Sequence, residues 1–289
     1  MNAPSARAID VIINVDDIGL HPAVRRAVED CAAHGSVTSA SVLANGPDGD
    51  AVRPYPGITL GAHLNILRGT PLSPRAEVRT LVGADGNFLG SFAKLAWRAA
   101  RGTIDLDEVR LEWSRQVAFL RGRGLELTHA DGEKHTHCLP GLFAVACDVA
   151  REHGISWIRR SDERFTARGS DAGLAGRVRR SILRALCESA RTPAGLRSAD
   201  AVWGIANQGS ALSAEACARA LEPVERAVIE IVCHPGKLGR DAFEIPASFG
   251  RMRVTQLWEP EYQSLRHGSW LAVAAQQGWR LRGFDAHRG

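Results

Sequence analysis

Long hydrophobic runs and paired cysteines are both missing from this chain of 289 residues. No run of about 18 consecutive apolar residues occurs, which argues against a membrane-spanning helix. The N-terminus leads directly into residues 9–14 without an apolar signal region, so we expect no secretory leader and a cytoplasmic location. Six cysteines are scattered without a Cys-x-x-Cys pair, as is typical of free buried thiols in a reducing compartment: Cys31, Cys138, Cys147, Cys187, Cys217 and Cys233.

A strong charge imbalance and nucleotide-binding signatures are also absent. The net charge is +4 and the isoelectric point is near 8.9, too mild an excess to imply a nucleic-acid partner. No Gly-x-Gly-x-x-Gly follows the first predicted strand, and no Walker loop occurs, so a nucleotide-binding fold lacks its signature. The composition, 45% hydrophobic and 24% charged, is that of a soluble globular protein.

What the chain does contain is an alternation of short apolar segments with helical patterns. Such alternation is typical of parallel strands joined by crossover helices. The number of units predicts a single α/β domain over residues 1–289, a closed TIM-barrel-like (β/α) barrel of seven to eight strands. Predicted strands cover 9–15, 37–43, 58–66, 125–130, 155–158, 201–205, 228–233 and 279–284. One predicted helix begins at Pro22, and further helices are predicted over 106–120, 141–153, 214–221 and 262–276. Residues 68–89 are predicted to form a loop.

One segment, residues 165–198, breaks this alternation and is predicted to be a basic helical insertion. It holds seven arginines and an apolar stripe formed by Val178, Ile182, Leu183 and Leu186. A basic amphipathic helix can lie on a membrane surface or hold an anionic group. The alternative is an outer barrel helix with a solvated face.

The segment from Asp131 to His137 carries the strongest chemical signal. Two carboxylates and two imidazoles stand at alternate positions, Asp131, Glu133, His135 and His137. In an extended chain these side chains share one face. Carboxylate and neutral imidazole are ordinary ligands of divalent cations, so the pattern indicates a metal site. The alternative is a solvated loop that is rich in charge.

Other acids and imidazoles follow separate predicted strands. Asp16 and Asp17 end the first strand, His63 lies late in the third, and His234 directly follows residues 228–233. Because working residues of a barrel lie where its strands end, we expect these groups to converge with residues 131–137. Structural alternatives remain open for each. Asp16 or Asp17 could cap the helix that begins near Pro22, and His63 could be a core histidine.

Five motifs, in order along the chain, resemble those of the YdjC-like carbohydrate deacetylases. This family includes chitooligosaccharide deacetylases and hopanoid-biosynthesis (HpnK-like) deacetylases. The matching segments are Asn14-Val-Asp16-Asp17-Ile-Gly19, Val37-Thr-Ser-Ala-Ser41, Gly61-Ala-His63-Leu-Asn65, Thr128-His-Ala-Asp131-Gly-Glu133-Lys-His135-Thr-His137 and Cys233-His234-Pro-Gly236.

The resemblance implies an irregular (β/α) barrel that binds one divalent ion, Mg²⁺ or Zn²⁺, through an Asp-His-His set. Asp17 and His63 match two of these ligands, whereas Glu133 stands in the slot of the third. Glutamate is a competent ligand, so an Asp-His-Glu set is chemically sensible but more anionic. A second option is that His135 takes the ligand role while Glu133 turns away. By the same resemblance, Asp16 would be the general base.

The remaining candidates are expected to act on the substrate or to position other groups. His234 is expected to protonate the departing amine, or else simply to mark the turn before Pro235. His135 and His137 are expected to hold ligands or substrate in place, as is Asp131, which could instead form a turn beside its glycine. Arg159, which follows a predicted strand, is expected to bind a sugar hydroxyl or an anion, or to be solvated.

The implied activity is metal-dependent removal of the acetyl group from an N-acetylated amino sugar or glycoconjugate, free or lipid-linked. Two alternatives stay open. Glu133 could mark a sugar- or metal-binding relative with altered catalysis, or the same metal could serve another acyl or phosphoryl bond. The expected partner is therefore a small sugar substrate, with no nucleic acid and no transmembrane segment. The oligomeric state is not predicted.

Overall fold

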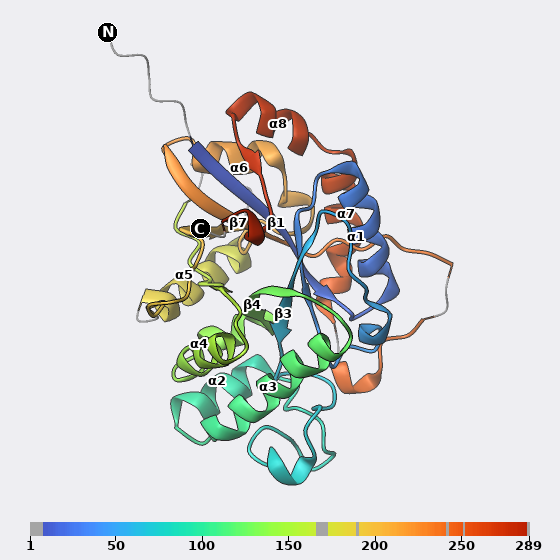
Figure 1. Ribbon diagram of the computed structural model, residues 1–289, viewed down its shortest axis with the longest axis vertical. Helices are drawn as coiled ribbons and strands as arrows, with labels where there is room; N and C mark the ends of the chain where they lie inside the picture. The colour runs from blue at the N-terminus through green and yellow to red at the C-terminus, as the bar shows by residue number, and fades with distance from the viewer. Residues whose placement is uncertain (1–7, 166–172, 189–190, 241–242, 251, 288–289) are drawn as a thin grey trace.

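The computed structural model describes residues 8–165, 173–188, 191–240, 243–250 and 252–287. In this part of the chain, strands form one sheet and helices pack around it (Figure 1). The strands are β1 (Ala8–Ile18), β2 (Ser39–Val42), β3 (Thr59–Leu64), β4 (Leu127–Gly132), β5 (Trp157–Ile158), β6 (Ala201–Trp203), β7 (Arg226–Cys233) and β8 (Arg280–Leu281). The helices are α1 (Pro22–His34), α2 (Phe92–Ala100), α3 (Leu106–Gly122), α4 (Leu142–Glu152), α5 (Leu174–Glu188), α6 (Ala214–Leu221), α7 (Trp258–His267) and α8 (Trp270–Gln277).

The sheet is parallel and curls on itself. Its strand order is β5-β4-β3-β2-β1-β7-β6, and β8 pairs with the beginning of β1. The two ends of this order approach each other after β5, where the backbone N–H of Val202 in β6 donates to the carbonyl of Asp162 at 3.2 Å. Eight strands in a curled parallel sheet confirm the predicted irregular (β/α) barrel.

Strand β1 and helix α1 form where the residue pattern predicts them. Apart from Ala8, every residue of β1 is buried, as expected for a central parallel strand covered on both faces. Helix α1 buries the predicted stripe and ends at Gly35, whose φ of 85° is the left-handed conformation that glycine adopts readily. Its N-cap is His21, whose ring accepts from Ala23 N, so the capping alternative for Asp16 and Asp17 is wrong.

Two helical regions differ from the prediction. Helix α2 (Phe92–Ala100) was not expected, because only Leu95 of its nine residues is buried and its core-facing pattern is weak. The predicted helix over 262–276 is two helices, since α7 ends before Gly268 and α8 begins at Trp270. Among the described residues, no helix combines the length and the apolar content that a membrane span requires.

The basic segment forms helix α5, while residues 166–172 and 189–190 lie outside the described part. The predicted stripe does not face one way. Leu183 is buried and Leu186 is half-buried, whereas Val178 and Ile182 are exposed.

Candidate metal and catalytic site

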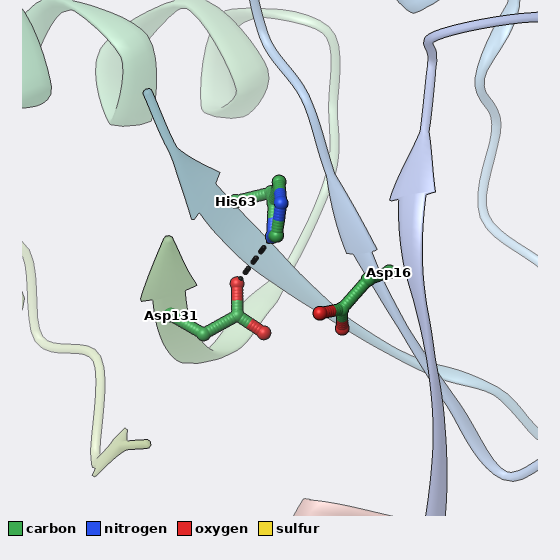
Figure 2. Close-up of side chains that lie close together, drawn as sticks. All are labelled: Asp16, His63 and Asp131. Atoms are coloured by element: carbon green, nitrogen blue, oxygen red, sulfur yellow. Dashed lines mark hydrogen bonds and ion pairs between the residues drawn. The ribbon is translucent and has the colours of Figure 1, made fainter. Parts of the chain in front are cut away.

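The sequence-predicted site residues gather at the carboxyl ends of the strands. Since all the strands are parallel, these ends meet at one edge of the sheet. Register places His63 of β3 directly beside Asp131 of β4. Figure 2 shows the side chains of His63, Asp131 and Asp16 directed toward one another. The residues concerned are Asp16 and Asp17 in β1, His63 in β3, Asp131 in β4, and Arg159 and His234 just beyond β5 and β7.

A β-bulge near the end of β1 brings two consecutive carboxylates to the site. Val15 pairs with Ala40 and Ile18 with Val42, so β1 advances by three residues where β2 advances by two. Within this bulge Asp17 has a φ of 67°. Consecutive side chains of a regular strand point to opposite faces. The bulge therefore allows both Asp16 and Asp17 to reach the same site.

Asp16 belongs to a buried network around Arg159. The guanidinium binds Asp16 in a bidentate pair, with both N–O distances 2.7 Å. It also lies 2.6 Å from Asp131 Oδ2 and donates to Glu230 Oε1 at 2.8 Å. Burial raises the pKa of Glu230 to about 7 against the opposing charge of Arg159. Burial would also raise the pKa of Asp131, but the charges of Arg159 and His63 hold it far below its usual range. Arg159 is buried, so the solvated alternative is wrong.

His63 lies between three carboxylates. Its Nδ1 is 2.7 Å from Asp131 Oδ1, and its Nε2 faces Asp17 Oδ1 at 3.3 Å and Glu133 Oε2 at 3.6 Å. Burial opposes protonation, but these carboxylates raise the pKa of His63 well above its ordinary value. Burial likewise opposes ionisation of Asp17, yet His63 lowers the pKa of Asp17 to about 2. The surplus of negative charge around one imidazole is an environment that favours a cation.

Two groups of side chains among the described residues could hold a metal ion. The first group is Asp17, His63 and Glu133, and the second is Asp16, His63 and Asp131. In each group, one ligand atom per residue lies within 4.8 Å of those of the other two. In the second group, Asp16 and Asp131 are already held by Arg159. In the first group, Asp17 Oδ1 is buried and accepts no hydrogen bond. The first group therefore fits a divalent ion better.

Glu133 is oriented by a residue of the predicted 68–89 loop. Its Oε1 lies 3.2 Å from Nε of the buried Arg68, while Oε2 faces His63. Arg68 is fixed in turn through Nη1, which donates to the carbonyl of Phe249 at 2.8 Å. The carboxylate of Glu133 is thus turned toward the imidazole.

The expectation of one extended face over residues 131–137 is wrong. Only the start of the segment is strand, because Glu133–Cys138 form a short 3₁₀ helix, η3, with positive φ at Lys134 and His135. His135 Nδ1 lies 2.8 Å from Ser161 Oγ, and His137 Nε2 lies 3.0 Å from the carbonyl of Arg159. Among the described residues, His135 belongs to neither group of possible ligands.

The simpler alternatives for this segment are also wrong. Glu133, His135 and His137 are buried, so the segment is not a solvated loop. Asp131 lies within β4 and pairs with β3, so it does not form a turn.

His234 is held near the site by Glu261 of α7. Its backbone N–H donates to Glu261 Oε2, and its ring Nδ1 lies 3.8 Å from the same oxygen. Glu261 Oε1 accepts from the N–H of Gly209 at 2.7 Å. The charge of His234 contributes to the lowered pKa of Asp17, so the imidazole lies within electrostatic range of the possible metal ligands.

Three buried site residues were not predicted: Arg68, Glu230 and Glu261. Glu230 could have been found, since it is a lone charge inside the apolar run Val228–Cys233 of a central strand. Arg68 and Glu261 lie in a loop and in the first turn of a helix, where charged residues are common. The residue patterns around Arg68 and Glu261 therefore do not indicate a functional site.

The sequence of this chain matches one protein family and resembles named proteins. The profile of the YdjC-like protein family matches residues 10–276. A human protein named carbohydrate deacetylase is 30% identical over 255 residues, which cover 82% of this chain and 76% of that protein. The mouse carbohydrate deacetylase is 31% identical over 249 residues, covering 79% of this chain and 78% of its own.

Among solved structures, the fold is similar to that of an Enterococcus faecalis protein with a suggested role in cellobiose-phosphate cleavage. The TM-score is 0.68 with 21% sequence identity, and the match covers 97% of this chain and 99% of the other.

Proposed function

Since this chain belongs to the YdjC-like protein family, we propose that it is a metal-dependent N-deacetylase of amino sugars. It would release acetate and a free amine from an N-acetylated amino sugar or glycoconjugate, including a lipid-linked one. The names of the human and mouse relatives support the substrate class. The observation that carries the proposal is the buried Asp17, His63 and Glu133 set, in which Asp17 Oδ1 accepts no hydrogen bond, beside the Arg159-bound Asp16.

Asp17, His63 and Glu133 would hold one divalent ion, Mg²⁺ or Zn²⁺. Such an ion polarises an amide carbonyl and lowers the pKa of a bound water. With the metal bound, Asp131 Oδ1 would accept a hydrogen bond from Nδ1–H of neutral His63 and so leave Nε2 free to act as a ligand. Arg68 holds the carboxylate of Glu133 toward the same point.

Asp16 would act as the general base toward the attacking water. Arg159 fixes the plane of its carboxylate through two hydrogen bonds. Among the described residues, Asp16 Oδ1 accepts from both Arg159 and Asn14, whereas Oδ2 accepts from Arg159 alone. Each carboxylate oxygen has two lone pairs, so Oδ2 retains one for the proton of a water. The geometry thus supports proton transfer at this atom.

His234 would supply the proton that the departing amine needs. An amine is a poor leaving group unless it is protonated as the C–N bond breaks. Glu261 fixes the backbone of His234 from one side and leaves its ring Nδ1 without a hydrogen bond. This nitrogen would therefore be available for a hydrogen bond to the substrate.

The test is acetate release from N-acetylglucosamine and its β-1,4 disaccharide by the protein loaded with Zn²⁺ or Mg²⁺. We expect release that falls by about 10²- to 10⁴-fold in Asp16→Asn, the range for losing a general base. Asp107→Asn is the control, since Asp107 is an exposed carboxylate in the first turn of α3, and it should keep full activity. Equal activity in wild type and Asp16→Asn would overturn the proposal, as would release of phosphate but no acetate from sugar substrates.

We further propose that the chain works as one barrel unit, with the segment at 165–198 as an insertion, in the cytoplasm. The cysteines support a reducing compartment, because all six are buried and free.

A further inference from the structure

A row of large apolar side chains runs along the outer face of α5. The exposed fractions are 71% for Leu174, 49% for Val178 and 51% for Ile182. Residues four apart lie on one side of a helix, so the three form a continuous row, here called the α5 stripe. Three of the seven exposed large hydrophobic side chains of the described chain belong to this stripe. Isolated exposed apolar residues are ordinary, but an aligned group points to an interaction surface.

The stripe is not part of the core, because the opposite face of α5 provides the packing. Leu183 and Cys187 are buried, and Leu183 packs with Val202 and Ile205. Gly176 lies so close to the carbonyl of Ala206 that an added Cβ would come within 2.4 Å of it. These contacts fix the orientation of the helix. The stripe is therefore held outward.

The charge on α5 is of one sign over most of its length. Four arginines lie between Leu174 and Cys187, and the first acidic residue is Glu188 at the end of the helix. At about 100° per residue, Arg177 and Arg184 fall beside the stripe on one flank. Arg179 lies on the other flank, where it donates to the carbonyl of Ile205 at 2.9 Å.

We propose that the α5 stripe binds the surface of an anionic lipid bilayer. A row of apolar side chains bordered by arginines is the arrangement of helices that lie in the bilayer interface. There the apolar groups enter the headgroup boundary, and the guanidinium groups meet lipid phosphates. Helix α5 lies at the outer edge of the molecule, where a convex helix can approach a flat surface (Figure 1). A protein partner would need a groove that is complementary to this convex face.

This surface adjoins the candidate site. Cys187, near the end of α5, contacts Cys138, which ends the η3 segment that contains Glu133. The carbonyl of Cys187 also accepts from Arg160, the residue after Arg159, at 3.0 Å. Bilayer binding through α5 would therefore hold the site close to the lipid surface. The inference does not depend on the chemistry at that site.

The test is co-sedimentation of the full chain with vesicles of equal parts phosphatidylcholine and phosphatidylglycerol, compared with phosphatidylcholine alone. We expect binding to the anionic vesicles that weakens as salt rises. The double variant Val178→Ser, Ile182→Ser should lose at least about tenfold in affinity, because each side chain no longer enters the interface. The double variant Arg177→Gln, Arg184→Gln should lose about tenfold on the anionic vesicles alone.

Leu271→Ser is the matched control. Leu271 is an exposed apolar residue on α8, which lies at the top of the molecule in Figure 1, away from α5. The control should bind vesicles as wild type does, and circular dichroism should show that all variants remain folded.

Three results would overturn the proposal. The first is that the wild type does not bind anionic vesicles. The second is that the serine double variant binds these vesicles as well as the wild type does. The third is that the serine double variant differs from the wild type only in its sedimentation without lipid. The last result would assign the stripe to contact between copies of this chain.

Discussion

Replacing Arg159 with methionine tests the buried network most sharply. The substitution removes the guanidinium that contacts Asp16, Asp131 and Glu230, and keeps a side chain of similar length. All four side chains are buried. Removing one partner of a buried ion pair leaves an uncompensated charge, which typically costs about 3–5 kcal/mol. We therefore expect the free energy of unfolding at neutral pH to fall by about that amount.

The loss should depend on pH in a defined direction. In the wild type, Arg159 and His63 hold the pKa of Asp131 below its ordinary value. A lowered carboxyl pKa stabilises the fold above the unfolded value near 4, and this contribution disappears as pH falls through the lowered folded value. Without Arg159, burial is no longer offset and the folded pKa of Asp131 rises above the unfolded value, so ionisation of Asp131 between about pH 4.5 and neutral pH destabilises the variant. The deficit of the variant should thus be largest at neutral pH and smaller near pH 4.

The assay is urea unfolding of metal-free wild type and variant at about pH 7.5 and about pH 4.5, followed by circular dichroism. Arg151→Met is the control, because Arg151 pairs with Asp148 on the exposed surface of α4. Exposed pairs of this kind contribute about 0–1 kcal/mol. A deficit for Arg159→Met below about 1 kcal/mol, or one that grows toward low pH, would refute the reasoning.

The remaining predictions concern the metal and the proposed acid. Asp131→Asn should weaken binding of Zn²⁺ by about 10- to 100-fold in a competition titration, because the carboxylate that orients His63 is lost, and unchanged affinity would contradict this role. Metal binding near neutral pH should release a proton from His63, whose pKa is raised in the metal-free protein, and calorimetry in two buffers would detect it. The stability that protonated His63 gives the metal-free fold should be full below about pH 6.5 and lost as pH rises through the higher folded pKa. Glu261→Gln should lower kcat for acetate release about tenfold with little change in KM, since it disturbs the proposed acid His234 but not substrate binding, whereas a change in KM alone would contradict this role.

Much of the fold was accessible from the sequence because parallel strands impose simple rules. Buried strands such as β1 are almost continuously apolar, and α1 shows a clear helical stripe that ends at Gly35. Once the strands are taken as parallel, their carboxyl ends must meet, which brings Asp17 and His63 together. This convergence required no knowledge of individual contacts.

The details of the site could not be predicted for local reasons. The turn at η3 depends on positive φ at Lys134 and His135, which non-glycine residues rarely adopt and no propensity indicates. The sequence favours an extended chain over residues 131–137, and this expectation puts His135 and His137 wrongly on one face with Glu133. The bulge at Asp16 and Asp17 is likewise visible only in the register of β1 against β2.

Long-range partners were also hidden. Arg68 contacts Glu133 from a loop without periodicity, and the Arg159 network joins residues far apart in the sequence. Such contacts depend on how the strands pack, which residue patterns do not encode.

The central claim is that Asp17, His63 and Glu133 together hold one divalent ion. An anomalous difference map from crystals soaked in Zn²⁺ tests it directly. We predict one peak about 2.0–2.2 Å from a carboxylate oxygen of Asp17, Nε2 of His63 and a carboxylate oxygen of Glu133. A peak bound by His135 in place of Glu133, or no peak at this end of the barrel, would contradict the account.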